Sequence, residues 1–103
     1  MGLLTLFGIN NKIKDALRQG AVIIDVRTPQ EFDEGKIRGS VNIPVDRIAA
    51  NIERIRSMRK PVILCCASGA RSEKAAGILK SQGLKEVYNG GSWTRVLRLI
   101  NSL

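Results

Sequence analysis

The sequence contains no histidine, and this absence removes several kinds of active site at once. Cysteine–histidine and serine–histidine pairs, histidine-based acid–base catalysis and the common zinc sites all need an imidazole. Aromatic residues make up only 4% of the chain, so the core must be aliphatic. The 103 residues suffice for one domain, and a hydrophobic share of 44% allows a compact core without crosslinks.

Cysteine is also scarce, since the chain has only Cys65 and Cys66, which are adjacent. Neighbouring cysteines do not make a disulfide framework, and a ring between them would be strained. Free thiols are typical of a reducing compartment, so we predict a cytoplasmic protein. No set of residues indicates a metal or an organic cofactor, and we expect neither.

No stretch approaches the ~20 apolar residues that a membrane span needs. Residues 1–9 form an apolar N-terminal segment that lacks the basic start and the cleavage site of a signal peptide. We predict that this segment packs on the domain or begins an amphipathic helix, with contact to a membrane surface or a partner as the alternative. A single domain is predicted over residues 10–103, and we expect a monomer because no other large apolar surface is evident.

The 17 basic and 9 acidic residues leave a net charge of +8, which favours anionic partners. The basic residues are spread along the chain, and no aromatic residue lies within the densest run, which comprises Arg54, Arg56, Arg59 and Lys60. Nucleic-acid-binding surfaces usually combine a basic stripe with stacking side chains. We therefore interpret the run as a solvated helix face and do not expect nucleic acid as a partner.

Strand-like and helix-like patterns alternate, which predicts an α/β domain with a small, mainly parallel sheet. Strands are predicted at residues 21–25, 41–43, 62–66 and 86–88, the last broken by Gly90-Gly91. Helices are predicted at residues 10–19, 29–34, 45–58 and 72–82 and from Trp93 onward. The second of these begins with a capping box at Thr28 and Glu31. Because ligands collect at the carboxyl ends of parallel strands, Cys66 lies at the expected place for a site.

The loop after this strand has the composition of an anion-binding nest. It comprises Cys66, Ala67, Ser68, Gly69, Ala70, Arg71 and Ser72. Small residues let several backbone N–H groups point inward, and a helix N-terminus favours a thiolate or an attached anion. Arg71 is unusual at a helix N-terminus, and a bound anion would explain it. The alternative is a buried strand end with two ordinary core cysteines.

Three segments of the chain together resemble the rhodanese-like domain over about residues 11–101. The first reads Asp25-Val26-Arg27, then Glu31-Phe32, then Gly35–Ser40 and Asn42-Ile43-Pro44, beside the family's "DVR…EF…GHIPGAxNIP". The second, Cys66–Ser72, resembles the active loop "CxxGxRS", and the third is Tyr88-Asn89-Gly90-Gly91 with Trp93, beside the family's "xxGGxxxW". The resemblance implies a sheet with helices on both faces and a sulfurtransferase without a cofactor.

The resemblance also implies the role of each loop residue. Cys66 would carry a sulfane sulfur taken from thiosulfate or a persulfide and pass it to a thiol, including a protein thiol, or to cyanide. The backbone of residues 67–72 and the charge of Arg71 would hold this sulfur. Lys36 stands where the family usually has histidine, and Arg38 where it often has proline. Together with Arg95, these two residues are candidates for the rim of the site.

Other residues of these segments are predicted to be structural. Asp25, Arg27 and Glu31 are interpreted as an ion-pair cluster beneath the site, and Trp93 as a core residue.

The adjacent cysteines permit two loop lengths. Counted from Cys65 the loop is Cys-x5-Arg, as in cysteine phosphatases and arsenate reductases, and counted from Cys66 it is Cys-x4-Arg, as in rhodaneses. Gly69 follows Cys66 by three residues, which is the spacing found in both families. We therefore predict that Cys66 is the nucleophile and Cys65 the last buried strand residue. A phosphatase and a non-catalytic persulfide or redox module remain the alternatives.

Overall fold

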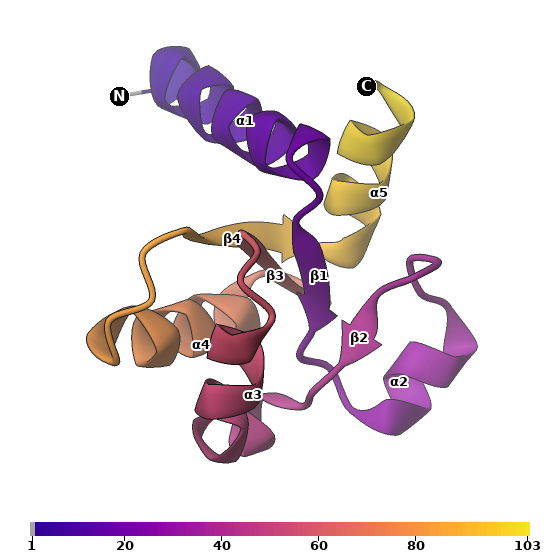
Figure 1. The fold of residues 1–103 in the computed structure, drawn as a ribbon. Helices are drawn as coiled ribbons and strands as arrows, with labels where there is room; N and C mark the ends of the chain where they lie inside the picture. The colour runs from indigo at the N-terminus through magenta and orange to yellow at the C-terminus, as the bar shows by residue number, and fades with distance from the viewer. Residues whose placement is uncertain (1) are drawn as a thin grey trace.

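The computed structural model describes residues 2–103, with side chains from Gly8 onward, and contains a four-stranded sheet in the order β2-β1-β3-β4 (Figure 1). All neighbouring strands pair in parallel. The strands are β1 (Val22–Asp25), β2 (Val41–Asn42), β3 (Val62–Cys66) and β4 (Val87–Ser92). The α-helices are α1 (Gly2–Arg18), α2 (Pro29–Glu34), α3 (Ile52–Ser57), α4 (Ala70–Ser81) and α5 (Trp93–Asn101). The predicted α/β fold is thus confirmed.

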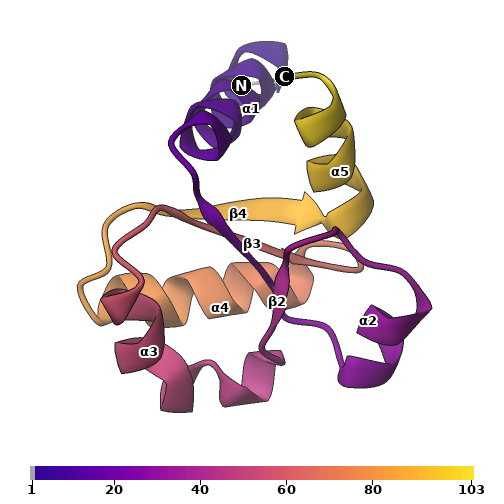
Figure 2. The ribbon, with the colours of Figure 1, turned by 45° about the vertical axis from the view of Figure 1, so that its right-hand side comes forward.

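Helices cover both faces of the sheet. In both ribbon views α1 and α5 lie on one face and α3 and α4 on the other, while α2 lies beyond the β2 edge (Figures 1 and 2). Every residue of β3 is buried, and its side chains alternate between two cores. Leu64 and Cys66 pack on the α4 side, whereas Ile63 and Cys65 pack on the α1 and α5 side. The two cysteines therefore point to opposite faces of the sheet.

The first helix is longer than residues 10–19, since α1 begins at Gly2 and buries Ile13 and Ala16 against the sheet. How the apolar side chains of residues 1–7 pack lies outside the described part of the structure. The predicted start of α2 is confirmed. The Thr28 hydroxyl accepts from the Glu31 N–H at 3.2 Å, and the Glu31 carboxylate accepts from the Thr28 N–H at 3.0 Å.

The prediction of one helix over residues 45–58 is wrong. The segment divides into 3-10 turns at Val45–Arg47 and Ala49–Asn51, followed by α3. The Asn51 side chain donates to the Arg47 carbonyl at 2.8 Å, while the Asn51 N–H bonds the Ile48 carbonyl instead. A side chain thus takes the acceptor that a continuous α-helix would use.

The glycine pair does not break β4, which continues through Gly90 and Gly91 with a shift of register opposite Leu64 and Cys66. A Cβ atom on Gly90 would lie 2.5 Å from Val96 Cγ2 and 3.0 Å from the Leu64 carbonyl oxygen. Glycine is therefore needed because the strand passes so close to β3 and α5. Helix α4 begins at Ala70, two residues earlier than predicted.

Candidate functional site

Cys66 ends β3 and is fully buried beneath the loop that leads into α4. Its Sγ accepts a hydrogen bond from the Gly69 N–H at 2.9 Å and lies 3.4 Å from the Ser72 hydroxyl. Gly69 has φ +106°, a left-handed conformation that turns its N–H back toward the sulfur. The loop therefore closes around Cys66, as the small residues at positions 67–70 predicted.

Opposing effects act on the thiol. Burial alone raises the pKa of Cys66, because the thiolate loses water. The Ser72 hydroxyl and the backbone N–H groups of Ser72, Gly69 and Ser68 stabilise the thiolate, and together they bring the pKa below its ordinary value. The arrangement favours a sulfur anion at the start of α4.

Cys65 has the opposite environment. It packs between β3 and the helices α1 and α5, and burial with the nearby Asp25 carboxylate raises the pKa of its thiol to about 12. At neutral pH this thiol is protonated and enclosed, so it is a poor nucleophile.

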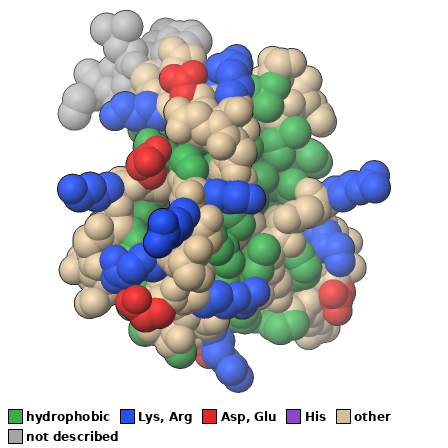
Figure 3. Space-filling view, in the orientation of Figure 1, with side chains coloured by type: hydrophobic (Ala, Val, Ile, Leu, Met, Phe, Trp, Pro, Cys, Tyr) green, Lys and Arg blue, Asp and Glu red, His purple; other side chains and the backbone are tan. Residues whose placement is uncertain are grey.

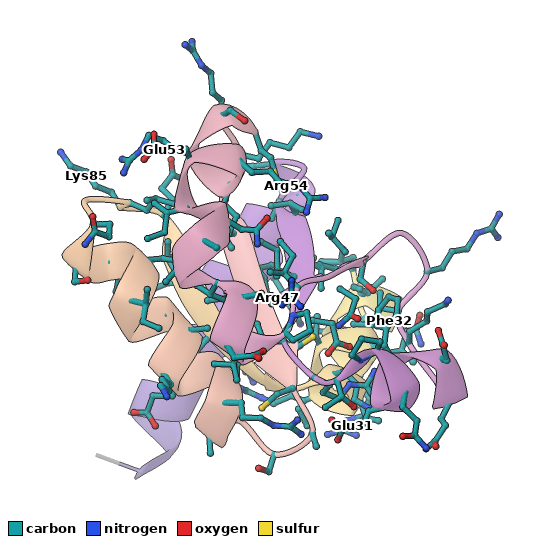
Figure 4. All side chains as sticks on the ribbon, turned by 90° about the horizontal axis from the view of Figure 1, so that it is seen from below. Glu31, Phe32, Arg47, Glu53, Arg54 and Lys85 are labelled. Carbon is teal, nitrogen blue, oxygen red and sulfur yellow. The ribbon has the colours of Figure 1, made fainter. Side chains whose placement is uncertain are left out.

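Arg71 does not project freely over the loop. Its guanidinium donates to both Glu31 carboxylate oxygens, at 2.7 and 3.0 Å, and so joins α4 to α2. The Arg71 hydrogen bond and the Thr28 N–H hold the pKa of Glu31 at about 2. The anion that accompanies this arginine in the structure is therefore Glu31 (Figure 4 labels it on α2).

The predicted cluster of Asp25, Arg27 and Glu31 is only partly correct. Arg27 and Asp25 form a buried ion pair with an Nη2–Oδ2 distance of 2.8 Å, but the Glu31 carboxylate faces Arg71. Arg27 bonds only the backbone carbonyl of Glu31, at 3.2 Å, and also the Gly35 carbonyl at 2.6 Å. The pair thus ties the end of β1 to the middle of α2 and to the residue that follows its C-terminus.

Trp93 joins this buried pair to the core. Its ring stacks under the Arg27 guanidinium at 4.9 Å and packs against the core on the α1 and α5 side. The core assignment of Trp93 is confirmed, although part of the ring is exposed.

The candidate rim cations have different positions. Lys36 is exposed and stacks over the Phe32 ring at 4.8 Å, and Arg38 is exposed in the following turn. Arg95 is committed elsewhere, since it donates to the Gly90 carbonyl at 3.2 Å and to Asn10 of α1. On the face of the molecule that Figure 3 shows, Lys and Arg side chains are scattered rather than aligned in one stripe.

Asn89 of β4 lies against the loop, although the sequence alone assigned no role to it. Its side chain contacts the Gly69 carbonyl, the Ser72 hydroxyl and the Gly91 N–H. A polar residue just before the glycine pair was the one available signal, and its partners in the loop lie 17 and 20 positions away.

Two negative findings apply to residues 2–103 only. In this part of the chain no helix is long and apolar enough to cross a membrane. Nor does the same part bring together three histidine, cysteine, aspartate or glutamate side chains in a group that would hold a metal ion.

Comparison with known proteins gives consistent matches. The family described as "Rhodanese-like domain" matches residues 10–95. The uncharacterized protein YqhL of Bacillus subtilis is 44% identical over 69 residues, which cover 67% of this chain and 54% of that protein. The thiosulfate sulfurtransferase GlpE of Pseudomonas syringae is 43% identical over 75 residues, 72% of this chain and 70% of GlpE.

Among solved structures, a rhodanese with anions from E. coli superposes with a TM-score of 0.67 at 28% identity, covering 73% of this chain and 89% of that one. The matched region spans about half of YqhL, so the activity of that whole protein does not transfer directly. The loop around Cys66, the parallel sheet and these matches lead to one assignment: the chain belongs to the rhodanese-like domain family.

Proposed function

We propose that the protein is a sulfurtransferase that carries a sulfane sulfur as a persulfide on Cys66. The observation that carries this proposal is the Cys66 sulfur itself, which accepts the Gly69 N–H at 2.9 Å at the N-terminus of α4. The lowered pKa of Cys66 supports a thiolate nucleophile. The relative GlpE is named a thiosulfate sulfurtransferase, which makes thiosulfate the first donor to test.

The first half-reaction is a displacement at sulfur. The Cys66 thiolate attacks the outer sulfur of thiosulfate, the S–S bond of the donor breaks, and sulfite leaves with the bonding electron pair. The product is Cys66–S–S⁻, whose charge is stabilised by the backbone N–H groups of residues 67–72. A thiolate or cyanide then attacks the outer sulfur, takes it as a persulfide or thiocyanate, and restores the Cys66 thiolate.

The donor must reach a sulfur that is fully buried in the closed loop. Ala67, Ser68 and Ala70 are exposed and have small side chains, so a small donor can approach the loop from solvent. Arg71 supplies a positive charge at the rim of the site, and this charge acts on both the donor and Glu31. The physiological acceptor is a thiol, and a protein thiol fits the exposed position of the loop.

The phosphatase alternative has less support. It requires Cys65 as the nucleophile, but this thiol lies on the opposite face of the sheet from the loop, and its pKa is about 12. A non-catalytic persulfide carrier would use the same loop and differs only in failing to pass the sulfur on.

Intact-mass measurement after brief incubation with thiosulfate tests the proposal on wild type, Cys66→Ser and Cys65→Ser. We expect wild type and Cys65→Ser to gain one sulfur atom that cyanide removes, and Cys66→Ser to gain none. A gain that persists in Cys66→Ser would refute the assignment. A gain that neither cyanide nor a thiol reverses would favour the non-catalytic carrier.

A further inference from the structure

The side-chain amide of Asn89 connects β4 to the loop around Cys66. Its Oδ1 accepts from the Gly91 N–H at 3.0 Å, and its Nδ2 donates to the Gly69 carbonyl at 3.3 Å. A backbone N–H can only donate and a carbonyl can only accept. Both contacts therefore fix which end of the amide is oxygen, and Oδ1 is the end that faces Ser72.

The Ser72 hydroxyl has one hydrogen and several acceptors around it. Its Oγ lies 2.7 Å from Asn89 Oδ1, 3.1 Å from the Gly69 carbonyl and 3.4 Å from Cys66 Sγ. The Gly69 carbonyl already accepts from Asn89 Nδ2 and from the Glu73 N–H at 3.0 Å. The hydrogen therefore points to Asn89 Oδ1, the nearest acceptor, and Ser72 presents a lone pair to Cys66.

This orientation of the Ser72 hydroxyl matches the neutral form of Cys66, although the backbone N–H groups of the loop favour the anion. The thiol S–H donates to Ser72, and Ser72 donates to Asn89, so each group in the chain is satisfied. An anionic sulfur can only accept, and to bond it Ser72 must turn its hydrogen away from Asn89. The charge-assisted bond that results is stronger than the neutral bond given up.

We propose that Asn89 is a positioning residue that directs the Ser72 hydroxyl. Asn89 Oδ1 accepts the Ser72 hydrogen while Cys66 is neutral, and Ser72 turns this hydrogen to the sulfur when the sulfur becomes anionic. The proposal deepens the function proposed above and rests on Cys66 being the nucleophile. A residue that merely supported the loop would increase the reactivity of Cys66. Asn89 should instead lower this reactivity, because it competes with the thiolate for the Ser72 hydrogen. Losing Asn89 should therefore make Cys66 more reactive, not less.

Other charges also surround Cys66. Arg71 of α4 is paired with Glu31 of α2 and is near enough to Cys66 for their charges to interact, and the Asp25–Arg27 pair lies at the end of β1. Arg95 of α5 lies against Gly91. All of these remain in the variants below, so differences among the variants report on Ser72 and Asn89.

The test is the pH–rate profile for alkylation of Cys66 by iodoacetamide, followed by peptide mass spectrometry in wild type, Ser72→Ala, Asn89→Ala and the double variant. We expect Asn89→Ala to move the profile to lower pH and to raise the rate on the acidic side about fivefold, the size of one competing neutral hydrogen bond. Ser72→Ala should move the profile to higher pH, and adding Asn89→Ala to it should change nothing further. A shift to higher pH or no shift in Asn89→Ala, or an equal shift in the Ser72→Ala background, would overturn the proposal.

A matched control is Asn42→Ala, which removes another amide at a strand end. Asn42 donates to the Asp25 and Arg27 carbonyls at 2.9 Å and lies outside the loop, so its loss should leave the profile unchanged. The same shift in Asn42→Ala would refute the specific role.

Asn89→Asp provides a second variant if Asn89→Ala does not fold. It keeps an acceptor for Ser72 and should move the profile to higher pH, whereas a move to lower pH would contradict the proposal. Alkylation needs no sulfur donor, so these outcomes are independent of whether thiosulfate loads Cys66.

Discussion

The buried pair of Asp25 and Arg27 offers the largest single effect on stability that the structure predicts. The exposed fraction of their side chains is 1% and 6%, and the guanidinium bonds Asp25 through Nε at 3.0 Å and Nη2 at 2.8 Å. Asp25→Ala would leave this cation buried with only the Glu31 and Gly35 carbonyls and the Trp93 ring for partners. Removing one partner of a buried pair costs about 3–5 kcal/mol.

This loss is large compared with the whole free energy of unfolding. A domain of 103 residues is stabilised by roughly 5–15 kcal/mol, so Asp25→Ala should remove between about a fifth and all of this stability. Urea unfolding followed by far-UV circular dichroism measures the change. The fluorescence of Trp93, the one tryptophan, reports separately on the neighbourhood of Arg27.

Controls separate the buried charge from a general effect of losing an aspartate. Asp15→Ala removes the exposed pair with Arg18, whose side chains are 67% and 58% exposed, and should cost less than about 1 kcal/mol. The double variant Asp25→Ala, Arg27→Met removes the unpaired charge and should recover at least about 1 kcal/mol of the loss. A loss below about 1 kcal/mol in Asp25→Ala alone would refute this reasoning.

Further predictions concern the loop and β4. Iodoacetamide at neutral pH should modify Cys66 and leave Cys65 unmodified until urea unfolds the chain, because the pKa of Cys66 is lowered and that of Cys65 is about 12. Peptide mass spectrometry measures the labelling of each cysteine, and equal labelling would contradict the prediction. Gly90→Ala should lower the free energy of unfolding by about 1–3 kcal/mol in urea titration, because its Cβ would lie 2.5 Å from an α5 methyl group; unchanged stability would show that the strand relaxes freely. Glu31→Gln keeps a capping side chain but leaves the charge of Arg71 unpaired. Because this charge is then available to the anionic donor, the KM for thiosulfate should fall in steady-state assays. A rise in KM would show that Glu31 orients the arginine. The pKa of Glu31 is about 2 in the folded protein and 4.5 ordinarily, so the stability from the Glu31–Arg71 pair should be complete above pH 4.5 and lost as the pH falls toward 2. Acid titration of wild type and Glu31→Gln compares their free energies of unfolding. A difference between the two that disappears at neutral pH would contradict the prediction.

The sequence predicts the features that depend on neighbouring residues. The buried strands follow from continuous apolar runs, the start of α2 from its capping box, and the loop from small residues between a strand and a helix. The features that it does not predict depend on distant partners. Asn51 breaks a helix whose apolar stripe is intact, and Glu31 pairs with Arg71 across 40 positions of the chain. Asn89 joins the site only because β4 lies beside β3.

The glycine pair also depends on distant partners that the local sequence does not reveal. A pair of glycines is a reasonable signal for the end of a strand when only local conformational freedom is considered. Gly90 is instead required by contacts with β3 and α5, which come from elsewhere in the chain. Local sequence therefore identifies the glycines as special positions without revealing whether a turn or a close approach explains them.

The contrast between the adjacent cysteines follows from the geometry of one strand. Successive side chains of β3 point to opposite faces, so one thiol must enter each core. On the α4 side the chain turns directly from Cys66 into the loop and the N-terminus of α4. The same burial that keeps Cys65 protonated is overcome at Cys66 by the N–H groups of this turn. The position of a cysteine relative to the pleat thus decides which of two identical side chains has a lowered pKa.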